Sequence, residues 1–231
     1  MTASITRRTE PHPARRNPAR RPRASMRPSP LRMAFTLIEP GPVVLVTTRD
    51  GERNNIMTIS WTMVVDFTPR FAITTGAWNY SFRALKRTRE CVIAIPTADQ
   101  LDEVVGIGTC SGADTDKFAK FGLTPMPGKL VAAPLIRECL ANIECRVIDI
   151  VRKHDIVVLE GIAAHVAASP RERRTLHAVG DGTFVVDGSK RDRRRQMAAK
   201  VPAGARSCAL RPPQVSCPTP GPRPFERGPS P

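Results

Sequence analysis

Two short segments place hydroxyl and amide side chains where they can bind an anionic or polar ligand. Asn79 and Ser81 open a predicted helix that runs to Thr88, and helix N-termini present unpaired N–H groups that suit phosphate. The competing interpretation is a plain N-cap, in which the same side-chain oxygens serve only the helix. Earlier in the chain, Thr58 and Ser60 alternate onto one face of a predicted strand. There they either meet a ligand or form an ordinary edge with outward hydroxyls.

Other reactive side chains stand more alone. Lys117 either adds a point charge to a bound phosphate or is a solvated helix lysine. Cys110, in the loop GTCSG (108–112), is either redox-active or simply a small residue. None of the six cysteines forms a CxxC pair or has a histidine at metal-ligand spacing, and no GxGxxG or P-loop signature occurs. We therefore expect no metal site, no structural disulfide and a reducing, cytoplasmic compartment.

The charge of the chain is concentrated at its two ends. The 231 residues carry a net charge of +15, which by itself suggests a nucleic-acid partner. Residues 1–33 and 190–231 each carry +8, whereas residues 34–189 carry −1. We therefore predict a folded domain over 34–197 and no nucleic-acid partner. We also predict a disordered basic Pro/Arg-rich extension before it (or a start codon placed too far upstream) and a disordered Pro-rich tail over 198–231.

Hydrophobic patterning predicts sequential antiparallel strands with few helices. The β-branched apolar runs are bounded by turn residues and indicate about six main strands, of which the last two pair through a turn at 152–155. No apolar run approaches the roughly 18 residues that span a bilayer, so no membrane partner is expected. This order indicates a mainly β barrel with short inserted helices. The expected strands are 42–48, 57–65, 70–75, 91–95, 139–151 and 156–166, with a hairpin within 180–188, and the expected helices are 79–88, 99–107 and 115–121.

Six short motifs, taken in order, resemble the flavin reductase-like family and its flavoredoxin branch in particular. The resemblance covers about residues 36–197 and implies an FMN-binding split β-barrel, usually a homodimer with the flavin at or near the subunit interface. The chain after Met197 resembles nothing in that family, so a frameshifted or read-through end is one hypothesis for it. The motifs are PGPVVLVTT (40–48), NIMTISW (55–61), NYSF (79–82), IPT (95–97), CSG (110–112) with DKF (116–118), and GDGTFVVDG (180–188).

The resemblance also implies which residues hold the flavin. The strand 55–61 would lie against the isoalloxazine and ribityl chain, the helix start and Lys117 would contact the phosphate, and Trp61 or Trp78 would wall the ring; each tryptophan is otherwise a core residue. In the wider family a histidine near the last long turn approaches the nicotinamide, which makes His154 the catalytic candidate; the alternative is a surface turn. The implied cofactor-binding residues are Asn55, Met57, Thr58, Ser60, Trp61, Asn79, Ser81, Phe82 and Lys117.

These residues lead to two expectations about function. The first is an oxidoreductase that passes electrons from NADH, NADPH or a protein donor through FMN to an acceptor. The second is an FMN-carrying electron-transfer protein without its own nicotinamide site. The expected partners are a second copy of the chain, flavin, and a nicotinamide or a redox protein.

Overall fold

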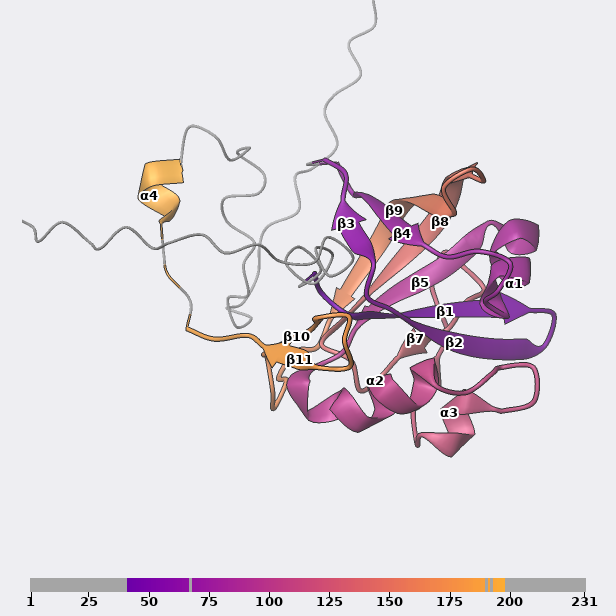
Figure 1. Ribbon diagram of the computed structural model, residues 1–231, viewed down its shortest axis with the longest axis horizontal. Helices are drawn as coiled ribbons and strands as arrows, with labels where there is room; N and C mark the ends of the chain where they lie inside the picture. Colours follow the sequence, from indigo (N-terminus) through magenta and orange to yellow (C-terminus); the bar gives the residue numbers. More distant parts are fainter. Residues whose placement is uncertain (1–40, 67, 190, 192, 198–231) are drawn as a thin grey trace, which may run out of the picture.

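One curled antiparallel sheet with short helices on its outside makes up the described part of the protein (Figure 1). The computed structural model describes residues 41–66, 68–189, 191 and 193–197. The extension predicted over 1–33 and the tail predicted over 198–231 lie outside the described residues. No helix in the described part is long and apolar enough to cross a membrane. The mainly β class expected from the sequence is confirmed.

Seven strands form the main sheet in the order β2-β1-β5-β8-β9-β4-β3, and every neighbouring pair is antiparallel. Gly51, with a φ of +63°, lies in the tight turn between the first two strands and adopts this conformation at little steric cost. The long hairpin turns at 152–155, as predicted. The strands are β1 Val44–Asp50, β2 Arg53–Ile59, β3 Thr62–Val64, β4 Arg70–Thr74, β5 Glu90–Ile95, β8 Ala141–Val151 and β9 Ile156–Val166.

The sheet is closed on itself by a short connection. β2 and β3 lie at opposite edges of the sheet, yet only Ser60 and Trp61 separate them in the sequence. The three residue steps from Ile59 to Thr62 span at most about 10–11 Å. The two edges must therefore approach each other at this point, which is the geometry of a split barrel.

The same connection corrects one prediction. The segment 57–65 was expected to be a single strand, but the chain changes its partner after Ile59. The Thr62 N–H donates to the Ser60 carbonyl at 3.0 Å, and the Thr74 N–H donates to the Trp61 carbonyl at 3.0 Å. The chain therefore leaves β1 and joins β4. No local pattern marks that change, because it depends on how far the sheet has curled.

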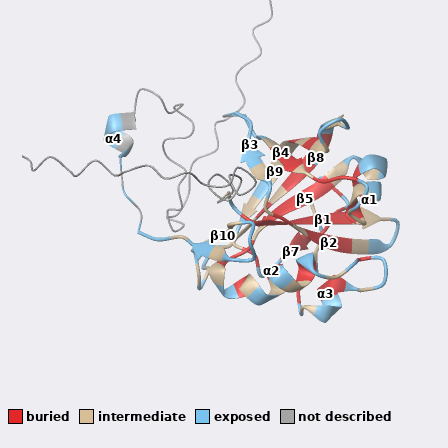
Figure 2. Ribbon diagram, in the orientation of Figure 1, coloured by how far each residue is buried: buried red, intermediate tan, exposed pale blue. Residues whose placement is uncertain are grey.

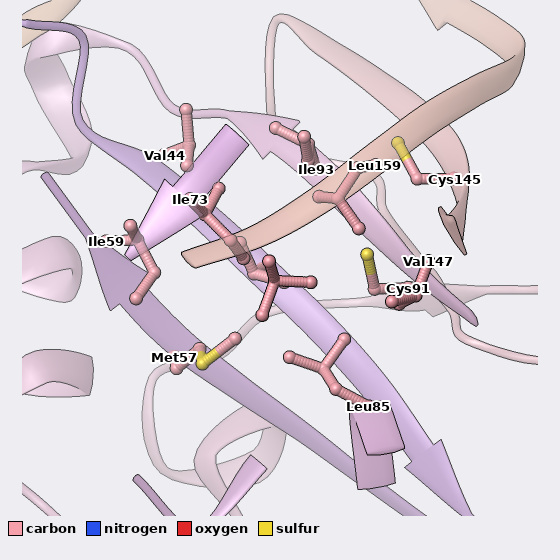
Figure 3. Close-up of a cluster of buried hydrophobic side chains, with 12 residues drawn as sticks. Val44, Met57, Ile59, Ile73, Leu85, Cys91, Ile93, Cys145, Val147 and Leu159 are labelled. Atoms are coloured by element: carbon pink, nitrogen blue, oxygen red, sulfur yellow. The ribbon is translucent and has the colours of Figure 1, made fainter. Parts of the chain in front are cut away.

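Apolar residues on both faces of β1 explain why this strand is central. Val44 and Val46 belong to a core drawn also from five other strands and the first helix, and Figure 3 shows Val44 within it. Val43 and Leu45 belong to a second core on the other face, beneath the short helices. The strands in the middle of the sheet are accordingly buried, whereas the helices expose their outer sides (Figure 2).

The remaining elements are short. Residues 125–126 (β6) and 135–136 (β7), for which no strand was expected, pair in a separate two-stranded sheet. The predicted hairpin within 180–188 takes its first strand from further upstream. These elements are the helices α1 Ser81–Thr88, α2 Leu101–Gly108, α3 Lys117–Lys120 and α4 Arg194–Met197, the 3-10 helix η2 Ala98–Gln100, and the strands β6 Pro125–Met126, β7 Leu135–Ile136, β10 Leu176–Ala178 and β11 Phe184–Val186.

Candidate functional site

A cleft with a volume of about 290 Å³ lies where β2, the β4–α1 connection and the α2–α3 loop meet. We call it the polar cleft. Five of the predicted cofactor-binding residues line it. They are Asn55, Met57 and Thr58 of β2, Asn79 before α1, and Lys117 of α3. Its lining consists of Asn55, Met57, Thr58, Trp78, Asn79, Tyr80, Ile107, Gly108, Thr109, Cys110, Ser111, Gly112 and Lys117.

Lys117 places a buried positive charge at this cleft. Its side chain is only 5% exposed, and its Nζ donates to the Ile107 carbonyl at 2.7 Å. That carbonyl lies in the last turn of α2, where helix carbonyls lack intrahelical partners. Burial lowers the pKa of Lys117, while the nearby Cys110 opposes this shift. Because an ammonium has three N–H donors, the bond to Ile107 leaves donors for a ligand. The solvated-lysine interpretation is therefore wrong.

Asn55 joins three elements behind the cleft. Its Nδ2 donates to the Ser81 Oγ at 2.7 Å, and both side chains are buried. A Cβ placed on Gly112 would lie 2.1 Å from the Asn55 Oδ1, a separation that no side chain tolerates. Glycine at 112 is thus what lets the α2–α3 loop close against β2. Ser81 stands behind Asn55 and does not line the cleft.

Asn79 lies one residue before the N-cap position of α1, which Tyr80 occupies without a side-chain cap hydrogen bond. The Asn79 Oδ1 accepts from the Ser81 N–H at 3.2 Å, and the Asn79 carbonyl accepts from the Phe82 N–H at 3.0 Å. Asn79 thus bonds two of the first helical N–H groups and also lines the cleft. Arg53 stacks on the neighbouring Tyr80 ring at 5.4 Å and donates to the Ala113 carbonyl at 2.6 Å. The contact of Asn79 with a phosphate stays a prediction.

Backbone and hydroxyl groups complete the polar lining. The Thr58 Oγ1 donates to the Val104 carbonyl at 2.7 Å, which ties β2 to α2 and leaves only the lone pairs of this oxygen to a ligand. Among the described residues, the backbone N–H groups of Cys110 and Gly112 have no hydrogen-bond acceptor. Free N–H groups in a glycine-rich loop form a typical anion-binding concavity.

Ser60 and Trp61 lie elsewhere. They line a second depression of about 270 Å³, which we call the apolar hollow. Its other lining residues are Gly41, Thr62, Met63, Ala72, Thr74 and Ile156. Trp61 is 56% exposed, so the alternative interpretation of Trp61 as a core residue is wrong. The turn of the chain after Ile59 explains this, because it rotates Trp61 away from the face that carries Met57.

Two further predicted residues line neither depression. Phe82 is partly buried against the barrel core, and its ring lies 6.0 Å from the Lys86 Nζ. His154 is exposed in the β8–β9 turn, where its backbone N–H donates to the Val151 carbonyl at 3.0 Å. Their predicted roles at flavin and nicotinamide stay predictions.

Some lining residues were not predicted. Tyr80, Ile107, Thr109 and Ser111 border the polar cleft without having been candidates. Tyr80 and Ser111 belong to the motifs NYSF and CSG, Thr109 directly precedes CSG, and Ile107 directly precedes the loop 108–112, so position in or beside a motif was their only signal. Trp78 and Cys110, which had been considered, do line the cleft.

Comparisons with known proteins place the chain in a family. The family profile described as "Flavin reductase like domain" matches residues 38–183. The uncharacterized protein YddH of Escherichia coli K12 is 32% identical over 180 residues, which cover 71% of this chain and 95% of that protein. An uncharacterized protein of Archaeoglobus fulgidus is 37% identical over 116 residues, covering 50% of this chain. The match spans only 66% of the length of the Archaeoglobus relative.

Solved structures show the same fold. The flavoredoxin of Desulfovibrio vulgaris (Miyazaki F) superposes with a TM-score of 0.62 at 26% identity, covering 67% of this chain and 90% of that one. An FMN-binding protein from Thermus thermophilus gives 0.61 at 20% identity, covering 74% and 98%. The chain therefore belongs to the flavin reductase-like family, and its fold is the split barrel of that family.

Proposed function

We propose that this protein is an FMN-dependent oxidoreductase that accepts electrons from NAD(P)H or a protein donor and passes them to an acceptor. The observation that carries the proposal is the buried Lys117 ammonium beside the free N–H groups of a glycine-rich loop. Family membership supports it, as do neighbours described as flavoredoxin and FMN-binding proteins.

The residues present fit a phosphorylated, hydroxylated ligand. Lys117 and the N–H groups of Cys110 and Gly112 are donors suited to the phosphate dianion. Because Gly112 has no Cβ, the loop can lie against the Asn55 side chain, in space that a Cβ would fill. When bound, FMN supplies the redox chemistry, by accepting a hydride or single electrons. The protein itself binds the phosphate, orients the ribityl chain along β2 through Thr58, and keeps the site rigid through the Asn55–Ser81 hydrogen bond.

We further propose that the protein is a homodimer. Trp61, Met63, Val64 and Val65 are all exposed on or beside β3, an edge strand. Contiguous apolar surface of this kind marks an interaction site. Each depression is also at or below the low end of the range of about 300–1,000 Å³ usual for ligand pockets, which favours a site completed by a second copy. The free cysteines Cys91, Cys110, Cys139 and Cys145 suit a reducing compartment such as the cytoplasm.

The second candidate is an FMN-carrying electron-transfer protein without a nicotinamide site. The observation that favours it is the position of His154, which is exposed and lines neither depression. The two candidates share the cofactor and differ only in whether the protein has its own nicotinamide site.

The test begins with the visible spectrum of the purified protein, for which we expect flavin bands near roughly 370 and 450 nm. Anaerobic addition of NADH or NADPH should bleach the longer-wavelength band. Bleaching by a protein donor alone would replace the first candidate with the second. A colourless protein that also fails to bind added FMN would refute both.

A further inference from the structure

An exposed tryptophan connects the polar cleft to the protein surface. Trp78 lines the cleft, yet 67% of its surface is exposed. Its ring lies over Gly76, so that a Cβ there would come within 2.3 Å of Trp78 Cζ3 and 2.8 Å of Asp155 Oδ1. Trp78 therefore lines the cleft and is open to solvent, and Gly76 lies between its ring and the Asp155 side chain of the β8–β9 turn. Tryptophan is enriched among the residues that dominate binding energy at protein interfaces.

One side of Trp78 carries a basic turn. Arg152, Lys153 and His154 are exposed at the β8–β9 turn. The Thr75 N–H donates to the Asp155 carbonyl at 2.9 Å, which fixes the turn to the segment leading to Trp78. The turn is therefore held beside the cleft.

The other side leads into a basic helix. α1 begins three residues after Trp78, and its exposed face carries Arg83, Lys86 and Arg87. The first turn of α1 contains no acidic residue. A single carboxylate, Asp50, pairs with both Arg83 and Arg87, so positive charge remains in excess. α1 and the β8–β9 turn lie on the same side of the domain (Figure 1).

We propose that this surface is a docking site for an acidic electron-carrier protein that reduces the cofactor of the polar cleft. We call it the basic rim: Trp78 with Arg83, Lys86, Arg87, Arg152 and Lys153. Opposite charges steer the encounter, and Trp78 supplies a central apolar contact next to the cleft. Each encounter moves one electron from the reduced carrier to the flavin. Two encounters and two protons from solvent therefore complete the reduction, and two carriers are oxidised. The inference rests on the proposed function, because the electrons need a flavin to receive them.

The charge distribution favours an acidic protein over a neutral one. Residues 34–189 carry a net charge of −1, so the cations of the basic rim are a local excess and not a property of the whole domain. Local excess charge around a cleft raises association rates about 10–10³-fold for a ligand of opposite sign. The same excess would repel a basic partner.

The experiment measures flavin reduction in the FMN-loaded full-length protein. A chemically reduced [2Fe–2S] ferredoxin with a strong negative net charge serves as the probe, and stopped-flow absorbance follows the loss of the flavin band. The test variant is Arg152→Glu with Lys153→Glu. At about 0.01 M salt we expect its second-order rate to fall about 10–100-fold. The difference should nearly vanish at about 1 M salt, where the Debye length is about 3 Å.

The matched control is Lys129→Glu with Arg137→Glu, which changes the net charge equally. Both residues are exposed, and Arg137 precedes β8 whereas the turn follows it. Eleven residues of strand separate the two, a length of about 35–37 Å along the chain. Residues 1–33 and 190–231 each carry +8 and attract any acidic protein in both variants. The contribution of the basic rim is therefore the difference in second-order rate between the two variants. Equal rates for both variants at low salt would overturn the proposal.

Two further measurements separate this proposal from the proposed function. Reduction by NADH should be equal in the two variants, and a parallel loss in the test variant would assign the rim to a nicotinamide donor and overturn protein docking. Calorimetric titration of oxidised ferredoxin onto the protein without FMN should show salt-sensitive binding that is weaker in the test variant. Failure to bind FMN refutes the proposed function while leaving this titration informative. Normal reduction by NADH without such binding refutes the docking site alone.

Discussion

The polar cleft and the apolar hollow have nearly the same volume, about 290 and 270 Å³, but the residues that line them differ in polarity. Thr58 contributes to the first and Ser60 to the second, although they are two residues apart on what reads as one strand face. The cleft combines a buried ammonium with a glycine-rich loop, whereas the hollow sits beside exposed Trp61 and Met63. The motif NIMTISW (55–61) therefore contributes residues to both depressions, because the chain turns at Ser60. We infer that the cleft recognises a charged ligand and that the hollow recognises a second copy.

The largest expected effect concerns the hollow. Met63→Glu should dissociate the dimer, because an unpaired charge buried at an interface costs about 3–5 kcal/mol. That corresponds to a loss of roughly a hundredfold or more in dimer affinity. Light scattering coupled to size-exclusion chromatography would measure the mass. The control Leu130→Glu alters another exposed apolar residue and should stay dimeric. A dimeric Met63→Glu variant would remove the hollow from the interface.

The next effect concerns the cleft. Lys117→Met should weaken FMN binding about 10–150-fold, since a hydrogen bond to a charged group contributes about 1.5–3 kcal/mol. Fluorescence titration of FMN gives the dissociation constant. Lys120→Met, an exposed lysine of the same helix, serves as the control and should bind FMN normally. Unchanged affinity in Lys117→Met would mean that this ammonium serves only the α2 carbonyl.

A smaller effect is expected from the loop. Gly112→Ala brings a methyl group against Asn55, and overpacking of this kind costs about 1–3 kcal/mol. We expect lower thermal stability and FMN affinity about fivefold weaker, because the loop must move away from β2. Gly188→Ala meets no atom within 4 Å and is the matched control. A stable Gly112→Ala variant with normal affinity would show that the loop closes without the Asn55 contact.

The smallest effect is a pH dependence. Burial lowers the pKa of Lys117 from its ordinary value of 10.5, so the native lysine loses its proton at a lower pH than the unfolded one. FMN affinity should therefore fall as pH rises through the lowered pKa, but by less than in Lys117→Met, because the neutral amine still donates hydrogen bonds. Between the two pKa values the unfolded chain binds more protons, so stability without FMN should rise with pH there. Both trends should be absent from Lys117→Met, measured by titration and by chemical denaturation.

Local sequence patterns predicted most of the elements and the pairing of the last two long strands, but not the other partners. The strands 139–151 and 156–166 and the turn at 152–155 were predictable, since their hydrophobic runs and turn residues act over short distances. The break after Ile59 was not, because strand 57–65 continues by pattern. The two-residue strands β6 and β7 carry too few residues for any periodicity.

The sequence by itself determined a mainly β domain with a polar β2, a helix that begins near Asn79 and Ser81, and a glycine-rich loop before Lys117. Those are properties of neighbouring residues, whose propensities and periodicity act locally. Only the tertiary structure decided that Lys117 is buried against the end of α2, that Ser81 serves Asn55, and that Ser60 and Trp61 leave the cleft. The physical reason is the curl of the sheet. Sheet closure brings distant segments into contact, and those contacts determine which polar groups are satisfied and which remain for a ligand.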